Sequence, residues 1–222
     1  MPKLQLNKLP THELSALEKS LLNSGVQALA GVDEVGRGCL AGPVVAACVI
    51  YPAMPGAFPA VTDSKLLSPV QRESLFDQIC QTVASWAVAS VSAAEIDVIN
   101  IHHASLKAMA LAVEQMPVQP DYLLVDGKFP TQLNLKQQAV VAGDRQCRII
   151  GAASILAKVW RDRLMTQYQA EYPNFSFAQH KGYPTKQHRE EIKQHGLTPL
   201  HRRSFKGCNL SRPVEKRESA VL

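Results

Sequence analysis

The sequence predicts an α/β fold, with a mixed β-sheet flanked by helices and a helical C-terminal segment. Short apolar runs rich in β-branched residues recur through the first two thirds of the 222-residue chain and predict buried strands. Segments with helix start and stop signals lie between them. The last third carries helix signals without a further strand pattern. Strands with interspersed helices, followed by helices alone, are typical of a mixed α/β domain.

The elements of the first half can be placed one by one. Thr11 is a suitable N-cap and Gly25 a suitable stop for the first helix, and Ser68-Pro69 is a strong helix start. In order, the expected elements are a helix over about 12–23, a strand ending at Asp33-Glu34, a strand over 44–51, a helix from Ser68-Pro69 to about 84, a strand over 86–91, and one or two helices over 92–116 that Pro117 ends.

The second half begins with two further strands, each of which leads into an aspartate beside a glycine. Residues 122–125 lead into Asp126-Gly127, and residues 139–142 lead into Gly143-Asp144. A long helix is then expected over about 149–168, and Pro184 is expected to start another that ends near 195.

Length and composition favour a single domain over residues 1–222. With 46% hydrophobic residues, the chain can build one substantial core. We expect a catalytic α/β core over about 28–170, a C-terminal helical segment over about 171–210 and a flexible tail over 211–222.

The cysteines and the lack of targeting patterns favour the cytoplasm. The five cysteines form no Cys-x-x-Cys pair, and their odd number and scattered positions suit reduced thiols. No apolar segment follows the N-terminus as in a signal peptide, and none approaches transmembrane length. We therefore expect a cytoplasmic protein without membrane contact, and a monomer by default.

Charge is distributed unevenly along the chain. Residues 1–120 contain seven Lys and Arg against ten Asp and Glu, whereas residues 121–222 contain seventeen against nine. The basic residues are densest over 201–206 and continue to Arg217. A basic half joined to a half with an acidic cluster fits a polyanion that is gripped on one side and metal-bound on the other. It also fits a soluble surface with an excess of basic residues.

The segment 31–38, with the sequence GVDEVGRG, carries the strongest functional signal. Adjacent buried carboxylates repel each other and lose hydration, so a chain keeps them mainly where a cation lies between them. Arg37 between two glycines suggests a phosphate as a further ligand. Successive strand residues point to opposite faces, so we expect Gly36-Arg37-Gly38 to break the strand and let both acids reach one site. The alternative is a surface turn with solvated acids.

Asp126 and Asp144 complete a set of four acids at three strand or loop tips. No histidine, and no cysteine at ligand spacing, accompanies them, so the set suits Mg²⁺ or Mn²⁺ rather than Zn²⁺. Two such ions roughly 3.5–4 Å apart can activate water and stabilise the leaving oxygen in phosphodiester hydrolysis. For each aspartate alone, a role in forming the turn after a strand is the simpler explanation. That explanation is much weaker for all four acids together.

A dinucleotide-binding fingerprint is formally present as Gly36-x-Gly38-x-x-Ala41, with Asp63 further along. That motif needs a helix directly after its glycines. Here Gly42-Pro43 and a β-branched run follow, so we reject a dinucleotide-dependent enzyme.

With these residues in place, the chain resembles ribonuclease HII, the bacterial type 2 ribonuclease H, from about Gly31 to Phe205. Several motifs in the same order are more specific than any one of them. They are segment 31–38 with residues 40–47, Asp63-Ser64-Lys65, Val125-Asp126-Gly127, Gly143-Asp144, residues 152–159 with Arg161-Asp162, and residues 180–185 (HKGYPT).

The resemblance implies a ribonuclease H-like mixed sheet and assigns site residues. The family's catalytic and metal-binding acids would fall on Asp33, Glu34, Asp126 and Asp144, with Mg²⁺ or Mn²⁺ as a two-metal cofactor. Its glycine-rich turn and its junction-sensing tyrosine, which together read a 2′-hydroxyl at an RNA–DNA junction, would fall on Gly36, Arg37, Gly38 and Tyr183. Candidate phosphate contacts are Lys65, Ser154, Lys158 and Lys181, although each lysine also fits a solvated surface, and Tyr183 also fits a packed ring beside Pro184.

The implied reaction is hydrolysis of the phosphodiester 5′ to a ribonucleotide, leaving 3′-hydroxyl and 5′-phosphate ends. The implied partners are RNA–DNA hybrids and duplex DNA with single embedded ribonucleotides, as in ribonucleotide excision repair. A sliding clamp recruited by the basic tail is a further possible partner, although no convincing clamp-binding motif follows Phe205.

Two alternative functions differ from this one in specific features. The sister enzyme ribonuclease HIII typically carries an extra N-terminal domain, for which thirty residues before Gly31 are too few, and usually has Lys where Arg37 stands. A non-catalytic binder of RNA–DNA hybrids, with a structural ion, would differ by lacking metal-dependent cleavage.

The chain also departs from the family pattern near the expected site. None of the departures removes a carboxylate, but they alter the surroundings of Asp144 and of the phosphate contacts, so turnover is expected to differ from the family norm. The departures are Cys39 for Pro, Leu66 for Lys, Lys128 for Asn, Ala142 for Lys, and the bulky basic stretch 145–148.

Overall fold

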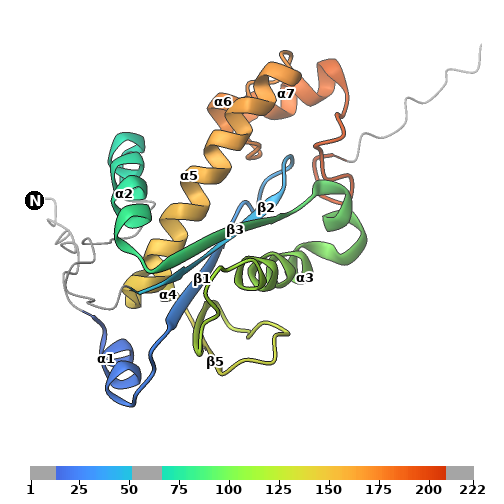
Figure 1. The fold of residues 1–222 in the computed structure, drawn as a ribbon. Helices are drawn as coiled ribbons and strands as arrows, with labels where there is room; N and C mark the ends of the chain where they lie inside the picture. The colour runs from blue at the N-terminus through green and yellow to red at the C-terminus, as the bar shows by residue number, and fades with distance from the viewer. Residues whose placement is uncertain (1–13, 52–66, 209–222) are drawn as a thin grey trace, which may run out of the picture.

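The computed structural model describes residues 14–51 and 67–208 and contains a mixed five-stranded sheet of order β3-β2-β1-β4-β5 (Figure 1). The first three strands pair antiparallel, whereas β4 and β5 extend the sheet in parallel with β1. This confirms the predicted mixed sheet. The strands are β1 (Leu29–Val35), β2 (Val44–Ile50), β3 (Ser85–Val91), β4 (Tyr122–Asp126) and β5 (Gln137–Val140).

Helices cover both faces of this sheet. Helix α5 crosses one face with α2 beside it, and α3 covers the other (Figure 1). Every residue of β2 is buried, as expected for a strand covered on both sides. The helices of the described residues are α1 (Ala16–Asn23), α2 (Pro69–Thr82), α3 (Ala93–Glu114), α4 (Gly143–Gln146), α5 (Arg148–Glu171), α6 (Phe177–His180) and α7 (Lys186–His195). Over the ranges 14–51 and 67–208, no helix is both long and apolar enough to cross a membrane.

Gly31 allows the start of α5 to lie directly against β1. A Cβ at this position would lie 2.6 Å from the carbonyl carbon of Ile149 and 2.7 Å from the nitrogen of Ile150. The buried carboxylate of Glu18, in α1, accepts hydrogen bonds from the Ile149 amide at 3.0 Å and from the Tyr51 hydroxyl at 2.7 Å. The beginning of α5 is therefore fixed beside the strand that carries the acidic pair.

Several element boundaries differ from those predicted. The first helix begins at Ala16 rather than near residue 12, because Ser15 and Glu18 cap it reciprocally, and the proposed N-cap Thr11 lies outside the described residues. Helix α7 has Thr185 as its N-cap, so Pro184 precedes the helix instead of starting it. The short helix α6 was not predicted. The predicted one or two helices over 92–116 form α3, which is interrupted at Asn100 by a positive φ of 63°.

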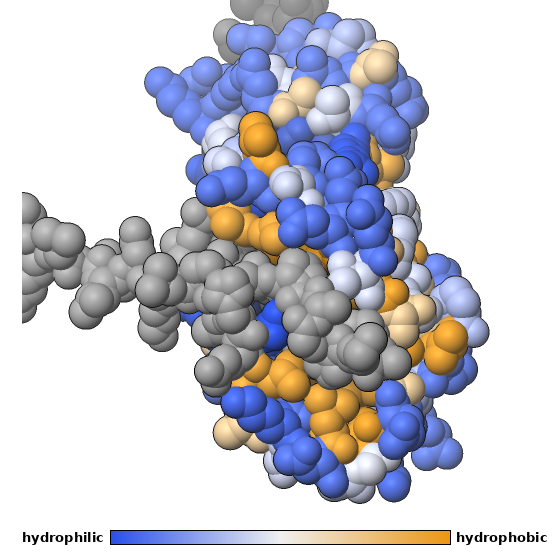
Figure 2. All heavy atoms as spheres, turned by 60° about the vertical axis from the view of Figure 1, so that its left-hand side comes forward, coloured by the Kyte–Doolittle hydropathy of each residue, from blue (hydrophilic) through white to orange (hydrophobic). Residues whose placement is uncertain are grey.

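The C-terminal elements form a third apolar cluster at the far end of α5. Phe175, Phe177 and Ile192 pack there against Met165 of α5 and Leu40 of the loop before β2. Hydrophilic side chains predominate over the upper end of the molecule in Figure 2, where Figure 1 places α6 and α7. The cluster attaches the C-terminal segment to the loop that follows β1.

Candidate active site

Two aspartates lie side by side at the ends of neighbouring parallel strands. Val32 of β1 pairs with Val125 of β4, so Asp33 and Asp126 follow at the next position of each strand. Both point to the face that α5 covers, because side chains alternate along a strand and Leu124, two residues before Asp126, packs in the α5 core. The sheet therefore delivers two carboxylates to one point without help from a loop.

Glu34 joins these aspartates. Asp33, Glu34 and Asp126 each offer a carboxylate oxygen, and these oxygens lie within 4.8 Å of one another. As predicted, the strand breaks at Gly36-Arg37-Gly38, because β1 ends at Val35 and Gly36 has a φ of 93°, although both acids still lie within β1. By alternation Glu34 belongs to the opposite face, so its longer side chain must reach around the end of the strand.

The cluster concentrates negative charge in a buried place. Burial, followed by the charges of Glu34 and Asp126, raises the pKa of Asp33 well above 3.8. Burial also raises the pKa of Glu34, against the opposing effect of Arg37. Oε1 of Glu34 accepts a hydrogen bond of 3.2 Å from Arg37, whereas the buried Oε2 has no hydrogen-bond partner among the described residues. One acceptor of the cluster is thus left unsatisfied.

Asp144 lies beside this cluster without being one of its three ligand groups. It sits in the one-turn helix α4, whereas β5 ends earlier, at Val140, so its predicted place at a strand tip is wrong. Oδ1 of Asp126 accepts hydrogen bonds from the amides of Gly143 at 2.7 Å and Asp144 at 3.4 Å. The fourth predicted acid is therefore tied to the third through its backbone. Ala142, just before α4, adopts a left-handed conformation.

The Gly36-Arg37-Gly38 turn directly follows β1, the strand that carries Asp33 and Glu34. A Cβ on Gly36 would lie 2.3 Å from Nε of Arg161, whereas a Cβ on Gly38 would meet no atom of residues 14–51 and 67–208 within 4 Å. Gly36 is buried and Gly38 is exposed. The first glycine is therefore required for packing, and the second leaves open space at the surface beside the acids.

Two buried arginines, Arg161 and Arg202, pack against this turn. Arg161 donates to the carbonyls of Pro43, Ala41 and Lys181 at 3.0, 3.1 and 2.8 Å. Arg202 donates to the carbonyl of Arg37 at 2.9 Å and twice to that of Gly42. Burial lowers the pKa of Arg202 to about 10. Of the basic residues over 201–206, only Arg203 and Lys206 are exposed, so fewer of them are available to a polyanion than the sequence suggested.

Tyr183 lies next to the turn because the Gly182 carbonyl accepts a hydrogen bond of 2.8 Å from the Leu40 amide. Tyr183 is 37% exposed, and Nζ of Lys158 lies 5.6 Å from the centroid of its ring. Lys158 pairs with Asp162 at 2.8 Å, and Nζ of Lys181 donates to the carbonyl of Asp162 at 3.1 Å. The structure thus brings three of the predicted substrate contacts together.

These three residues border a cavity of about 760 Å³ between α2, α5 and α6. Arg72 and Arg163 also line it, although Arg163 is paired with Glu73. The carboxylate cluster does not line this cavity. This basic groove instead lies beside Tyr183, and so beside the turn that follows the acids.

The two remaining candidate residues have different outcomes. Ser154 of α5 hydrogen-bonds the carboxylate of Asp33, so its hydroxyl serves this acid in the structure. Lys65 lies outside the described residues, as does Leu66. Of the other family departures, Cys39 is fully buried beside the Lys181 carbonyl and Lys128 is exposed.

Sequence reasoning missed the supporting residues. Arg161 follows Ala153 and Ala157 at helical spacing, so its place in an apolar stripe was a readable sign of burial. His180, His188 and His201 are likewise buried and hydrogen-bonded. Their spacing carried no signal, because they come from three separate segments.

Comparison with known proteins agrees with this geometry. The sequence model of the family described as ribonuclease HII matches residues 30–208. The chain is 49% identical over 179 residues to ribonuclease HII of Borrelia hermsii, covering 80% of this chain and 98% of the relative. It is 50% identical over 181 residues to ribonuclease HII of Pelodictyon phaeoclathratiforme, covering 79% of this chain and 88% of the relative.

Solved structures share the fold. Ribonuclease H2 from Pyrococcus horikoshii matches with a TM-score of 0.68 at 27% identity, covering 82% of this chain and 95% of that one. The structure of the PCNA:RNase HII complex from Archaeoglobus fulgidus matches with a TM-score of 0.66 at 25% identity, covering 81% and 95%. The chain therefore belongs to the ribonuclease HII family and is a type 2 ribonuclease H, an endonuclease.

Proposed function

We propose that this ribonuclease H requires Mg²⁺ or Mn²⁺ and cleaves the phosphodiester 5′ to ribonucleotides. Its substrates would be RNA–DNA hybrids and single ribonucleotides embedded in duplex DNA, and its products would carry 3′-hydroxyl and 5′-phosphate ends. Asp33, Glu34, Asp126 and Asp144 would hold the metal, as two ions.

One observation carries the metal assignment. Three carboxylates offer oxygens within 4.8 Å of one another, and the buried Oε2 of Glu34 has no hydrogen-bond partner in the described part of the chain. An unpaired buried acceptor is costly, and a divalent cation would satisfy it while offsetting the repulsion that raises the pKa of Asp33. Oxygen donors alone suit a hard cation. The residues present therefore fit the proposed group.

The chain's own residues would divide the work. Bound metal would lower the pKa of an attacking water and stabilise charge on the leaving oxygen. Asp33 and Asp126 present carboxylates from a rigid sheet, Ser154 orients Asp33 by a hydrogen bond, and Asp126 holds the backbone of Asp144 in place. Rigid placement of this kind limits the reorganisation needed during reaction.

Substrate recognition would use the neighbouring surface. The exposed Gly38 and the half-exposed side chain of Arg37 leave room for a ribose at the turn, where close backbone amides can hydrogen-bond a 2′-hydroxyl. The ring of Tyr183 would pack on the sugar that follows. Lys158 and Lys181, with Lys65, would contact phosphates along the basic groove.

The proposal also includes one protein partner and an oligomeric state. The Archaeoglobus fulgidus relative was solved as a complex with PCNA, which supports contact with a sliding clamp here. We also propose a monomer, because the site is assembled within one chain.

The test uses a labelled DNA duplex that contains one ribonucleotide. Wild type and Asp126→Asn are incubated with Mg²⁺ or Mn²⁺, and an all-DNA duplex serves as the control. A single cut 5′ to the ribonucleotide, lost in the variant and absent from the control, is expected. Tight hybrid binding without cleavage under either ion would refute the proposal and favour a hybrid-binding protein.

A further inference from the structure

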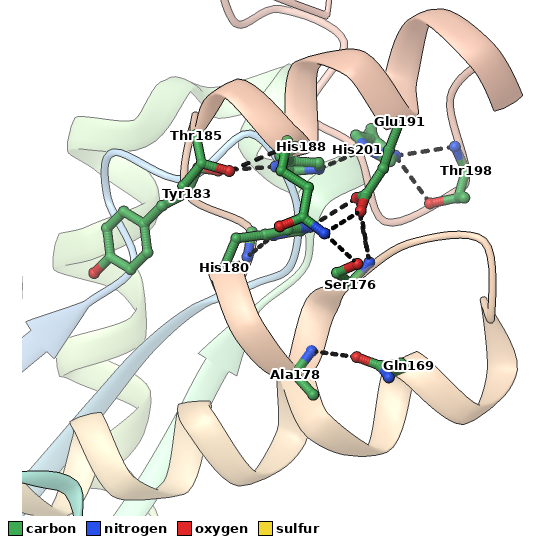
Figure 3. Close-up of polar contacts among 12 residues, drawn as sticks. Gln169, Ser176, Ala178, His180, Tyr183, Thr185, His188, Glu191, Thr198 and His201 are labelled. Carbon is green, nitrogen blue, oxygen red and sulfur yellow. Dashed lines mark hydrogen bonds and ion pairs between the residues drawn. The ribbon is translucent and has the colours of Figure 1, made fainter.

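Three buried histidines form a connected group behind Tyr183. His180, His188 and His201 come from α6, α7 and the segment after α7, and their exposures are 6%, 0% and 2%. The rings of His180 and His188 stack with centroids 4.1 Å apart, and the Nε2 atoms of His188 and His201 lie 3.1 Å apart. Figure 3 shows the group on one side of the turn, with the ring of Tyr183 extending away from it.

Main-chain groups fix the protons of the His188–His201 pair. The Thr198 amide donates to Nδ1 of His201 at 3.0 Å, so that nitrogen carries no proton. The Tyr183 carbonyl, which can only accept, lies 2.9 Å from Nδ1 of His188, so that nitrogen carries one. In the neutral pair, Nε2–H of His201 must therefore donate to the bare Nε2 of His188. The hydrogen bonds at both ends of this pair, to Thr198 and to Tyr183, require the same placement of the protons.

Hydrogen bonds also fix the position of the proton on His180. The Gly182 amide donates to its Nδ1 at 3.1 Å, so Nε2 holds the proton and donates to Glu191 at 2.9 Å. Burial opposes ionisation of Glu191, but hydrogen bonds from Ser176 and His180 outweigh it and lower the pKa of this carboxyl. The amide of Gly182 and the carbonyl of Tyr183 are thus both bonded to histidines.

The turn between these bonds is strained. The strain lies at Lys181, a non-glycine residue with a left-handed φ of 50°, and such a conformation persists only where its surroundings impose it. Gly182 follows with a φ of 81°, which a glycine adopts freely. Nδ1 of His180 must stay bare to accept the Gly182 amide, and Nε2 of His188 must stay bare to accept Nε2–H of His201. Each of these two rings must therefore be neutral. Burial lowers the pKa of both His188 and His201 to about 4, which keeps them neutral near pH 7.

We propose that His188, with its proton placed by His201, is a positioning residue that sets the backbone of Tyr183 for its contact with the substrate sugar. His188 does not itself touch substrate; it acts through the bond from Nδ1–H to the Tyr183 carbonyl. The inference rests on the proposed function, because it takes Tyr183 as the sugar contact.

The experiment combines three single variants with a second background. His188→Leu removes both ring nitrogens, whereas His188→Asn retains an N–H donor close to the position of Nδ1. His195→Leu is the matched control, an exposed histidine of the same helix outside the bonded group. Each is made in wild type and in Tyr183→Ala, and kcat/KM is measured on the duplex with one ribonucleotide.

The expected result is coupling between the two residues. His188→Leu lowers kcat/KM by about tenfold in wild type, an effect comparable to one lost hydrogen bond, and by less than about twofold in Tyr183→Ala. His188→Asn recovers most of the loss, and His195→Leu leaves the rate unchanged. Nitrogen NMR of the folded protein at neutral pH finds the proton on Nδ1 of His188 and on Nε2 of His201.

The outcomes that would contradict the role of His188 can be distinguished from those that would contradict the proposed function. An equal loss from His188→Leu in both backgrounds, or the opposite tautomers by NMR, would overturn the positioning role and leave the proposed function intact. If Tyr183→Ala by itself left kcat/KM unchanged, the proposed sugar contact would be wrong, and the role of His188 would fall with it.

Discussion

Asp126 and Gly143 are joined by a hydrogen bond of 2.7 Å from the Gly143 amide to Oδ1 of Asp126. The carboxylate that belongs to the acidic cluster therefore also caps the short helix α4, which carries Asp144. Gly143 allows this approach, because a Cβ there would lie 2.6 Å from Cδ1 of Ile150 and 3.2 Å from Oδ1 of Asp126. One bond thus connects the end of a strand to the turn that supplies the fourth acid.

Asp126→Asn is expected to abolish chemistry while preserving the fold. The asparagine oxygen can still accept the Gly143 amide, but the loss of one negative ligand should lower the single-turnover cleavage rate by about two orders of magnitude or more. Hybrid affinity, measured by fluorescence anisotropy, should change little because it depends on basic residues elsewhere. The metal-free variant should also melt at a higher temperature, because one of the charges that repel Asp33 is gone.

Asp121→Asn is the matched control for this prediction. Asp121 also accepts backbone amides, those of Gln27 and Ala28, but lies outside the cluster. It should retain the wild-type cleavage rate. A loss of hybrid binding as large as the loss of rate in Asp126→Asn would contradict the separation of binding from chemistry.

Mg²⁺ or Mn²⁺ is expected to stabilise the folded protein without any substrate. The cation would bind the folded cluster and not the unfolded chain, so at about 100 times its Kd it should add roughly 2.7 kcal/mol to the free energy of unfolding. Glu34→Gln should lose most of this gain, because it removes one ligand charge beside the unpaired Oε2. Thermal melts with added metal and with chelator measure both. Equal metal-induced shifts in wild type and Glu34→Gln would exclude Glu34 as a ligand.

The two glycines of the turn should respond differently to alanine. Gly36→Ala places a Cβ 2.3 Å from the buried Arg161 at a φ of 93°, so it should lower the free energy of unfolding by about 2 kcal/mol or more. Gly38→Ala meets no atom of the described residues within 4 Å and should melt like wild type. It should still lower kcat/KM on the ribonucleotide duplex, because its methyl group enters the space proposed for the ribose. Thermal melts and kinetics of both variants test this difference. An equal loss of stability in the two variants would contradict it.

The sequence predicted the acids better than their surroundings. Asp33 and Asp126 were recognisable because each ends an apolar run, and register between parallel strands then brings them together. The approach of Glu34 around a continuous strand could not be foreseen, because alternation alone assigns it to the other face. Asp144 was identified as an acid after a strand, but its helix depends on the hydrogen bond to Asp126, which is a tertiary contact.

Long-range contacts explain most of the remaining differences. The N-cap at Ser15 depends on a local Ser-x-x-Glu pattern that the sequence contained, but Glu18 is buried only because Tyr51 and Ile149 bond to it. The buried histidines are joined across separate segments. Patterns of residue type and spacing describe one element at a time, and these partners belong to different elements.

Acid should weaken the fold through the His188–His201 pair. Burial lowers the pKa of each from 6.5 to about 4, with a further lowering from neighbouring histidine charge, although the hydrogen bond from His188 to the Tyr183 carbonyl acts in the opposite direction. Below pH 6.5 the unfolded chain therefore binds more protons than the folded one. The contribution of the neutral pair is fully present above that pH and is lost as the pH falls towards about 4. At roughly 1.4 kcal/mol per pKa unit, the pair should account for several kcal/mol.

Urea unfolding at a series of pH values measures this dependence in wild type and His188→Leu. The other titratable or charged groups that act on the pair are His180, Glu191 and Arg203, and all three remain in the variant. His188→Leu should be less stable at neutral pH, because the bond to the Tyr183 carbonyl is lost. Its stability should nevertheless fall less steeply between neutral pH and about pH 5, because one titrating ring is gone and His201 no longer faces it. Identical slopes for the two proteins would show that the pair is not held neutral by burial.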